Sequence, residues 1–280
     1  MAKTIVTHVS PDIDGIGAIW LLKKLHPDFR NAKLAFVPAG DSTYNNEPVD
    51  SNSDVLHVDT GLGKFDHHLT NNFTCGTKLI YEYLVGEGYI KEDDCALKRF
   101  VEIVCQIDHG FDNYKWSDSS DDRYEFLLHN ILTGWKILYP RSDEKYVEWT
   151  IHALESIYKI LQLKVKAERQ IDEGCKFQTK WGKGIAVYTE NESVLDLAIK
   201  LGYAVAVRKD PGRGHIRVTG SNKHDVDLTS VYKMLKKADP SASWFLHASK
   251  MLLRNGSSRN PTMKASKLTI DDLIEILKKA

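Results

Sequence analysis

Two short apolar runs of the chain each lead directly into acidic and histidine residues. The first run, residues 3–7, is followed by His8, Asp12 and Asp14. Runs of this length that are rich in Val, Ile and Thr are typical of buried strands, and the apolar spacing of residues 15–25 is typical of a helix. The start of the chain therefore predicts a strand, a polar loop and a helix, the succession found in α/β folds.

The second run repeats this arrangement further along the chain. Residues 54–58 form another apolar strand pattern that ends in Asp59, and the triplet Asp66-His67-His68 follows. In open α/β sheets, ligands bind outside the carboxyl ends of the strands, where loops from several strands converge. We therefore expect both sets of acidic and histidine side chains to meet at one edge of the sheet.

Carboxylates and imidazoles gathered in this way are suited to divalent metal ions. A lone Asp-x-Asp or His-His pair is more often a turn or a helix cap, but two such clusters at predicted strand ends favour a metal site. Carboxylate oxygens suit Mn²⁺ and Mg²⁺, and imidazole shifts the preference toward transition metals, so we predict two Mn²⁺ ions, with Mg²⁺ or Co²⁺ as alternatives. Two ions roughly 3.5–4 Å apart can share a carboxylate and a bridging water, which then supplies hydroxide near neutral pH. Hydrolysis of a phosphoester is the natural use of such a centre.

In order and chemistry, these motifs resemble those of the DHH phosphoesterase superfamily. That superfamily includes single-strand exonucleases, nanoRNases, cyclic-dinucleotide phosphodiesterases and manganese-dependent inorganic pyrophosphatases. The segments that are similar to its four motifs are, in chain order, His8 to Gly15, Asp59, the triplet Asp66-His67-His68, and Asp108 after an apolar helix.

The resemblance implies a role for each matching residue. The metal ligands that it implies are His8 and Asp12 on one ion, Asp14 and His67 on the other, Asp59 as a catalytic bridge between them, and Asp108 completing the pair. His68 would face the substrate as the catalytic acid, a role that suits a side chain titrating near neutrality. Asp66 would orient a neighbouring imidazole. Two alternatives stay open: His57 is either a further ligand or a half-buried strand histidine, and Asp112 could replace Asp108.

The composition is that of an ordinary globular protein with room for two domains. The chain has 280 residues, of which 42% are hydrophobic and 27% charged. Its apolar stretches are too short to span a membrane, and no charged-then-apolar leader precedes Ile5, so we expect a cytoplasmic protein. Four cysteines without a C-x-x-C pattern favour reduced structural thiols.

The pattern of the chain changes near residue 175. Residues 145–174 have the apolar spacing of one long helix, whereas short strand patterns alternate with helices beyond them. The last helix, residues 270–279, is signalled by a capping box of Thr269 and Asp272. We therefore predict an α/β protein with two domains. Residues 1–174 would form a DHH-like catalytic domain with a mostly parallel sheet flanked by helices. Residues 175–280 would form a smaller α/β substrate-binding domain, with the active site in the cleft between the two.

Charge is divided unequally between the halves of the chain. Residues 1–140 carry 13 Lys and Arg against 21 Asp and Glu, and residues 141–280 carry 25 against 17, although the whole chain has no net charge. We expect the basic half of the chain to bind phosphate groups of the substrate. The turn containing Arg213, Gly214 and His215 resembles the glycine-rich element with which the second domain of the family grips a phosphate, but a routine hairpin is the alternative.

A second basic stretch, residues 244–259, offers further contacts to a substrate. His247 is the best candidate there, and Trp244 or Phe245 could stack on a base, although aromatic residues at strand positions more often belong to a core. The predicted partner is a nucleotide or a short single-stranded oligonucleotide. Neither a membrane nor a long duplex is expected as a partner, because the net charge is zero and no basic tail exists. Assembly of several copies is possible.

Three classes of function remain. The leading one is a metal-dependent phosphoesterase, a phosphodiesterase or exonuclease that hydrolyses bonds in nucleotides or short oligonucleotides. An inorganic pyrophosphatase is less favoured, because the chain lacks the Arg-Lys-His-Gln-type element of that subgroup. The third class is a non-catalytic nucleotide-binding protein, disfavoured because every metal-ligand position of the motif is filled.

Overall fold

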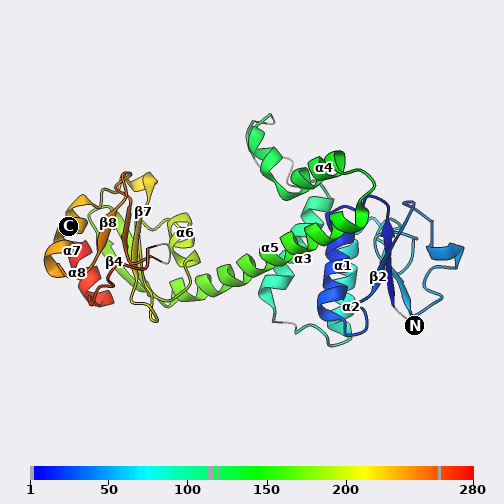
Figure 1. Cartoon of the computed structure of the whole chain (residues 1–280), viewed down its shortest axis with the longest axis horizontal. Coiled ribbons are helices and arrows are strands. Elements are labelled where there is room, and N and C mark those ends of the chain that lie inside the picture. Colours follow the sequence, from blue (N-terminus) through cyan, green and yellow to red (C-terminus); the bar gives the residue numbers. More distant parts are fainter. Residues whose placement is uncertain (1–2, 92, 112–115, 119, 258–259) are drawn as a thin grey trace. The chain divides into compact units, whose positions relative to one another are not determined.

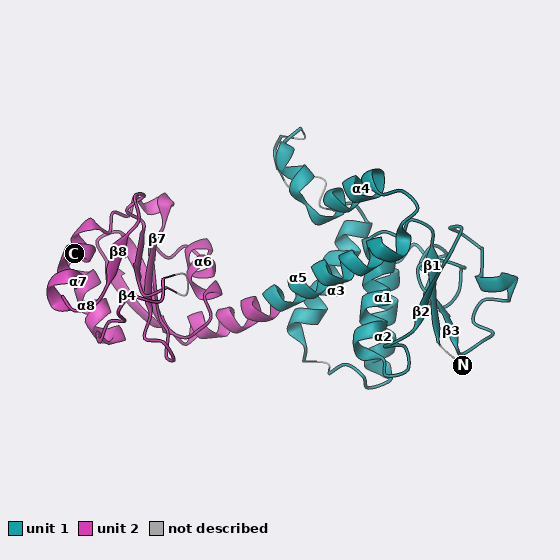
Figure 2. Ribbon diagram, viewed as in Figure 1, with its two compact units in different colours: residues 1–161 teal, residues 162–280 magenta. Residues whose placement is uncertain are grey.

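The computed structural model describes residues 3–91, 93–111, 116–118, 120–257 and 260–280 (Figure 1). The chain divides into two compact units, residues 1–161 and 162–280, and the division lies within the long helix α5 (Asp143–Asp172) (Figure 2). The boundary that we predicted, between residues 174 and 175, coincides with the start of β4 (Cys175–Thr179). Both units mix helices and strands, so the protein is α/β.

Unit 1 is built on a sheet of three parallel strands in the order β2-β1-β3. The strands are β1 (Thr4–His8), β2 (Lys33–Val37) and β3 (Val55–His57). The central strand β1 is almost wholly buried and rich in β-branched residues, as a strand flanked on both sides should be. Because all three strands run in the same direction, the loops that follow β1 and β3 leave the sheet at one edge.

Helices of unit 1 pack around its first helix. They are α1 (Ile13–Leu25), α2 (Gly76–Gly86), α3 (Cys95–Asp108) and α4 (Leu128–Leu138), with short 3-10 turns at Tyr44–Asn46 and Asp122–Phe126. Helix α1 contacts α2 and α3 and is buried on every side from Ile13 to Leu22. The indole N–H of Trp20 in this helix donates a hydrogen bond of 2.9 Å to Glu155 of α5. An all-round apolar helix is expected where neighbours cover each face.

Unit 2 contains a mixed sheet of six strands in the order β4-β5-β6-β7-β9-β8. Its remaining strands are β5 (Gly182–Tyr188), β6 (Val205–Lys209), β7 (Ile216–Gly220), β8 (Trp244–Leu246) and β9 (Leu252–Asn255). Only β5 and β6 pair in parallel among these neighbours. Its helices are α6 (Ser193–Lys200), α7 (Thr229–Ala238) and α8 (Ile270–Lys279), with a 3-10 turn at Asn222–His224.

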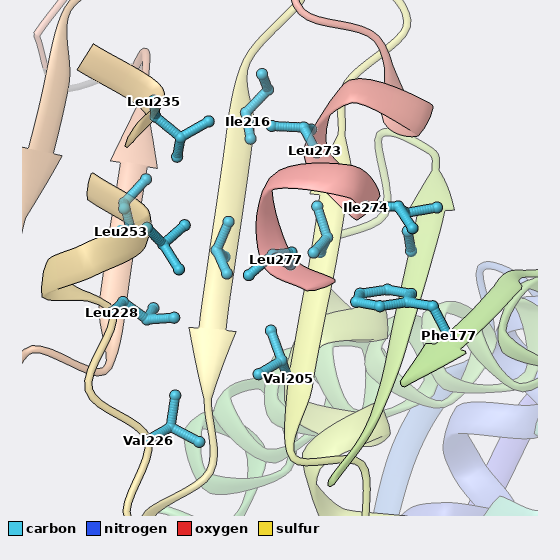
Figure 3. Packing of buried hydrophobic residues seen from close by; sticks show 14 of the residues in the cluster. Phe177, Val205, Ile216, Val226, Leu228, Leu235, Leu253, Leu273, Ile274 and Leu277 are labelled. Atoms are coloured by element: carbon cyan, nitrogen blue, oxygen red, sulfur yellow. The ribbon is translucent and has the colours of Figure 1, made fainter. Parts of the chain in front are cut away.

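The main core of unit 2 lies between one face of this sheet and helices α7 and α8. Alternate strand residues point into it, among them Val205 of β6, Ile216 of β7 and Leu253 of β9 (Figure 3). They meet Leu235 of α7 and Leu277 of α8. The predicted capping box at the start of α8 is present, and it fixes where this helix begins. Within the described residues, no helix combines the length and the apolar character needed to cross a bilayer.

Candidate metal centre

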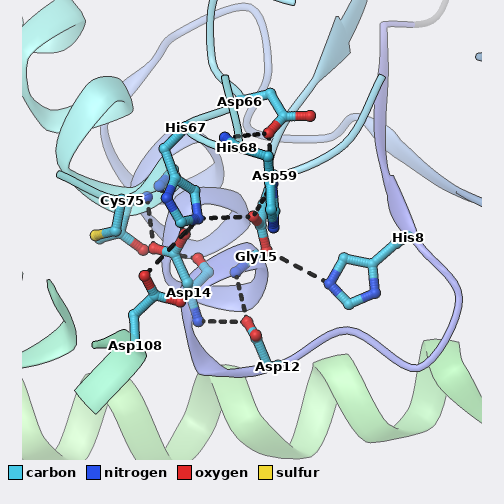
Figure 4. A network of polar contacts seen from close by, with 12 residues as sticks. His8, Asp12, Asp14, Gly15, Asp59, Asp66, His67, His68, Cys75 and Asp108 are labelled. Carbon is cyan, nitrogen blue, oxygen red and sulfur yellow. Dashed lines mark hydrogen bonds and ion pairs between the residues drawn. The ribbon is translucent and has the colours of Figure 1, made fainter. Parts of the chain in front are cut away.

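The edge of the unit 1 sheet gathers the predicted metal ligands. His8 is the last residue of β1, Asp12 caps α1, and Asp14 lies in the first turn of that helix. Asp59 follows β3 by two residues, and Asp108 is the last residue of α3. These side chains and His67 converge in Figure 4. The close approach comes from parallel strands that end together.

The converging side chains form two groups that lie next to each other and are connected through Asp59. His8, Asp12 and Asp59 make one group, Asp14, His67 and Asp108 make another, and within each group one ligand atom per residue lies within 4.8 Å of the others. Asp59 joins the groups, because its Oδ2 lies 3.4 Å from Nε2 of His8 and its Oδ1 lies 3.4 Å from Nε2 of His67. This division is the one that the family resemblance implied for the ligands of two ions.

The surroundings of Asp59 fit a bound cation. Its side chain is 3% exposed, and Oδ1 accepts no well-directed hydrogen bond from any described residue, the long contact of 3.4 Å to Nε2 of His67 being its nearest ion pair. The backbone at Asp59 has φ of 52°, a left-handed conformation that costs energy for a side chain other than glycine and that is found where function requires it. A buried carboxylate oxygen without a donor is costly unless a cation compensates it. The donor set of oxygen and imidazole nitrogen fits Mn²⁺.

Asp14 is held in place by the start of α2. The backbone N–H groups of Gly76 and Thr77 donate to its carboxylate at 2.6 and 2.8 Å. A Cβ atom at Gly76 would lie 3.0 Å from Oδ2 of Asp14 and 3.1 Å from Cβ of Asp59, so glycine permits this close approach. Burial, followed by the nearby charge of Asp59, raises the pKa of Asp14 to about 7.

The histidines supply the positive charge that faces these carboxylates. Hydrogen bonding to Asp59 is the largest cause that raises the pKa of His67, to about 9, and the same aspartate raises the pKa of His8. Nε2 of His67 also lies 3.8 Å from Asp14 and 3.7 Å from Asp108. Burial raises the pKa of Asp108. A metal ion at this place would compete with the protons on the imidazoles, because only neutral imidazole is a ligand.

His68 has surroundings that differ from those of His67. Its side chain is 59% exposed, and its Nδ1 lies 2.6 Å from Oδ1 of Asp66. Asp66 is itself fixed, because its Oδ2 accepts the backbone N–H of Leu62 at 2.8 Å. A carboxylate at Nδ1 favours a proton on that nitrogen and orients the ring, and Nε2 can donate a proton when the ring is an imidazolium that carries a proton on both nitrogens. Nδ1 of His68 also lies 3.9 Å from Asp59, so His68 completes a further possible ligand group with Asp59 and His67.

The two alternatives left open by the sequence have different outcomes. His57 is buried and belongs to none of the ligand groups found among the described residues. Its Nε2 accepts the backbone N–H of Tyr44 at 3.0 Å, so the ring is a structural support of that loop. Asp112 lies outside the described residues.

A small pocket beside the ligand groups was not found by sequence reasoning. Its volume is about 210 Å³, and it is lined by Asp12 and Asp108 on one side and by His129, Lys136 and Tyr146 among others. Lys136 donates to the carbonyl of Ser10 at 2.9 Å, and burial lowers its pKa. These residues belong to α4 and α5, which carry no recognisable motif. Only their proximity to the ligands marks them.

Exposed aromatic rings also adjoin the candidate centre. Phe73 and Phe111 stack with centroids 5.5 Å apart and an angle of 9° between the planes. His109 lies 4.6 Å from Phe73 and 6.4 Å from the ring of His67. No periodic pattern indicates this cluster, because the two phenylalanines lie in loops far apart along the chain.

The predicted substrate residues of unit 2 lie in two turns. Arg213 and Gly214 belong to the hairpin between β6 and β7, where Oδ1 of Asp210 accepts the backbone N–H groups of Gly212 and Arg213 at 2.9 Å each. These two N–H groups are therefore already engaged.

The other two predicted substrate residues, His215 and His247, differ in exposure. The His215 ring packs directly on Gly256, where a Cβ atom would lie 2.1 Å from it. His247 is exposed and contacts Ser249 through Nδ1.

Of the two aromatic residues predicted to stack on a base, only one is available. Trp244 is buried, and its indole N–H donates to the carbonyl of Asp239 at 3.2 Å, so Trp244 is part of the core. Phe245 is 49% exposed. The described part of the stretch 244–259 ends at Ser257.

No protein-family model and no curated protein matches this sequence. One solved structure, described as the DHH domain of a member of the s1p family of ribosomal proteins, aligns with 99% of this chain and 86% of its own length. The two sequences are 14% identical over the alignment, and the TM-score is 0.34. Similarity at this level supports no argument about activity, so the site rests on its own geometry.

Proposed function

We propose that this protein is a metal-dependent phosphoesterase of the DHH superfamily that hydrolyses nucleotides or short oligonucleotides. The observation that carries the proposal is Asp59, whose two oxygens face separate ligand groups and whose Oδ1 accepts no well-directed hydrogen bond from any described residue. A two-ion centre with one shared carboxylate would account for both facts. When bound, two Mn²⁺ ions would lower the pKa of water and stabilise charge on a phosphoryl group.

The residues of the chain would then have distinct tasks. His8 and Asp12 would hold one ion, Asp14, His67 and Asp108 the other, with Asp59 between them. His68, oriented by Asp66, would give a proton from Nε2 to the leaving oxygen of the substrate. Lys136 lies at the adjacent pocket, where its ammonium group would attract a phosphate oxygen.

A nucleotide substrate is favoured over inorganic pyrophosphate by the rings beside the centre. Phe73 and Phe111 are exposed, and aromatic faces of this kind stack on bases. Pyrophosphate has no such group to stack. A non-catalytic binding protein is less favoured, because His68 and its partner Asp66 add an exposed imidazole beside the ligand groups, which metal binding alone does not require.

A substrate panel tests the proposal. Protein stripped of metal and reloaded with Mn²⁺, Mg²⁺ or Co²⁺ would be incubated with pyrophosphate, dinucleotides, cyclic dinucleotides, and short RNA and DNA. We expect hydrolysis of a nucleotide substrate, fastest with Mn²⁺, and no hydrolysis by the Asp59→Asn variant. Preferential release of phosphate from pyrophosphate would favour the pyrophosphatase alternative, and no turnover by any loaded form would leave only binding.

A further inference from the structure

The sheet of unit 2 has one face that helices cover only in part. On the other face, α7 and α8 cover the core residues of β6, β7, β8 and β9. On the partly covered face, α5 and α6 pack on residues of β5 and β6, such as Ile185 and Ala206. The side chains of β7, β9 and β8 on this face are half-buried or exposed, and no described helix of unit 2 packs a hydrophobic core against them.

Four residues on adjacent strands lie opposite one another and form a row across this face, from its covered part to its open part. Arg208 of β6 pairs with Arg217 of β7, Arg217 pairs with Arg254 of β9, and Arg254 pairs with Phe245 of β8. Directly opposed residues project from the same face with Cβ atoms about 4.5–5.5 Å apart. We call these four residues the arginine row. Like charges opposed in this way repel each other unless something negative lies among them.

Among the described residues, acceptors pair with the arginine row at Arg208 and, through Glu192, at Arg217. Arg208 is 2% exposed, and its guanidinium donates to the carbonyls of Thr189 and Glu190 at 3.1 and 3.0 Å. Glu192 is shared, at 3.4 Å from Arg208 and 2.5 Å from Arg217.

The open end of the row lacks such partners. Arg254 is half-buried, and its side chain has no hydrogen bond or ion pair with any described residue. Burial, together with the charges of Arg208 and Arg254, keeps the pKa of Arg217 below its usual value in spite of Glu192.

A pocket lies at the place where the row becomes open. Its volume is about 360 Å³, and Arg217 and Arg254 line it together with the hydroxyls of Ser193 and Thr219. Glu192 and the exposed Asp196 form the wall on the α6 side. Hydroxyls and guanidinium groups are all donors to a phosphate, and Arg binds its oxygens through a planar fork.

Phe245 gives this site an aromatic neighbour. It follows Arg254 in the row, it is 49% exposed, and its ring lies 6.5 Å from that of His247. An exposed ring beside a phosphate-binding arginine is the pairing with which proteins bind unpaired nucleotides, because the base stacks while the phosphate is held.

We propose that the open part of the arginine row binds one nucleotide unit of a single strand, with its phosphate on Arg217 and Arg254 and its base on Phe245. This assignment rests on the proposed function only for the class of ligand. The site needs no metal ion, and it differs from the predicted turn at Arg213, whose neighbouring N–H groups Asp210 already occupies.

Binding measured without hydrolysis tests the assignment. The full chain in EDTA would be titrated against a fluorescein-labelled oligouridylate, and anisotropy would be followed at several salt concentrations. Arg254→Ala should weaken binding roughly 10- to 100-fold, the effect of losing one charge-assisted contact. The slope of log K against log salt should fall by about 0.7, because one phosphate contact is lost.

Phe245→Leu provides a second, independent measurement. It should weaken binding roughly 5- to 100-fold, because one stacked base is lost, while the salt slope stays unchanged. Lys237→Ala, which removes an exposed charge from α7 on the other face, is the matched control and should bind as the original protein does. Circular dichroism would establish that each variant is folded.

Several results would overturn the assignment. Unchanged affinity in both Arg254→Ala and Phe245→Leu would do so, as would an equal loss in Lys237→Ala. Competition distinguishes the sources of phosphate: uridine monophosphate should displace the probe better than inorganic phosphate does. Equal displacement by the two would remove the base contact from the proposal. Because no turnover is measured, failure of this site leaves the proposed hydrolysis untouched, and an inactive metal centre leaves this site untouched.

Discussion

The two units bury charges of opposite sign, and they compensate them in different ways. In unit 1, Asp14 and Asp59 are buried, and among the described residues their cationic neighbours are histidines. In unit 2, Arg208 is buried to a similar extent, but carbonyl and carboxylate oxygens of the same unit accept hydrogen bonds from its guanidinium. Buried charge needs compensation in either case. In unit 1, the proposed metal ions would supply part of that compensation.

This difference separates groups that support the fold from groups that are available to a ligand. The compensated charge of Arg208 stabilises the second sheet and leaves little for a ligand to gain. Among the described residues, Oδ1 of Asp59 and the guanidinium of Arg254 lack such compensation, so a ligand at either place would remove an unfavourable interaction. The proposed ligand is a cation in unit 1 and an anion in unit 2.

The largest expected effect comes from Asp59→Asn, because this change removes the carboxylate that faces both ligand groups. Changes to groups that merely support a metal ligand typically cost roughly 10- to 100-fold in metal affinity, so loss of a shared ligand should cost more. We expect no measurable turnover and less than the full complement of Mn²⁺ by elemental analysis. Unchanged metal content in this variant would contradict the assigned site.

The His68→Ala variant tests whether His68 acts as the catalytic acid or as a metal ligand. Its ring is fixed by Asp66 and is exposed, so we expect turnover to fall on the order of 10²–10⁴-fold while bound Mn²⁺ stays as in the original protein. Asp66→Asn is a milder companion, which should lower turnover less, because it alters only the orientation of the ring. Loss of metal together with activity would make His68 a ligand and would remove the distinction between the two histidines.

Arg208→Met tests the compensated charge of unit 2. The change removes the guanidinium from the buried carboxylate of Asp210 and leaves the carbonyls of Thr189 and Glu190 without its hydrogen bonds, so we expect a loss of about 1–3 kcal/mol in the free energy of unfolding, measured with urea. Mn²⁺ binding by unit 1 should not change. A stability within about 0.5 kcal/mol of the original would show that this buried charge contributes no more than a surface residue does.

The smallest expected effect is a change of stability with pH in protein free of metal. The pKa of His67 is raised from 6.5 to about 9, so the folded protein holds this proton more tightly than the unfolded chain. The resulting stabilisation is fully present below pH 6.5 and is lost as pH rises through 9. The pKa of Asp14 is raised from 3.8 to about 7, so its ionisation also lowers the stability of the folded protein as pH rises from 3.8 to 7.

Thermal unfolding in EDTA measures this dependence. We expect the unfolding midpoint to fall as pH rises from 6.5 to 9, and to fall much less with saturating Mn²⁺, because the ion then replaces the proton. His67→Gln should remove most of the decline in EDTA. A midpoint that rose over this range would contradict the assigned protonation of His67.

Local patterns predicted much of the fold and named the candidate ligands, which the structure brings together. The β-branched run at residues 4–8, the long apolar spacing of α5 and the capping box of α8 are signals from neighbouring residues, and all three elements are present. Asp59 could be chosen from its place after an apolar run. Such signals are readable because strand alternation, helix period and capping each act within a few residues.

Long-range packing decided what these patterns could not. His67 and Asp108 approach within 3.7 Å only because α3 packs on α1, and the arginine row exists only because β6, β7 and β9 pair in one register. Strand alternation places Trp244 and Phe245 on opposite faces of the sheet, but it does not show which face is covered. Either residue could therefore have stacked on a base. Helix α7 and its neighbours covered the face of Trp244. Coverage depends on segments remote in sequence, so only the tertiary structure assigned Phe245 to the open face.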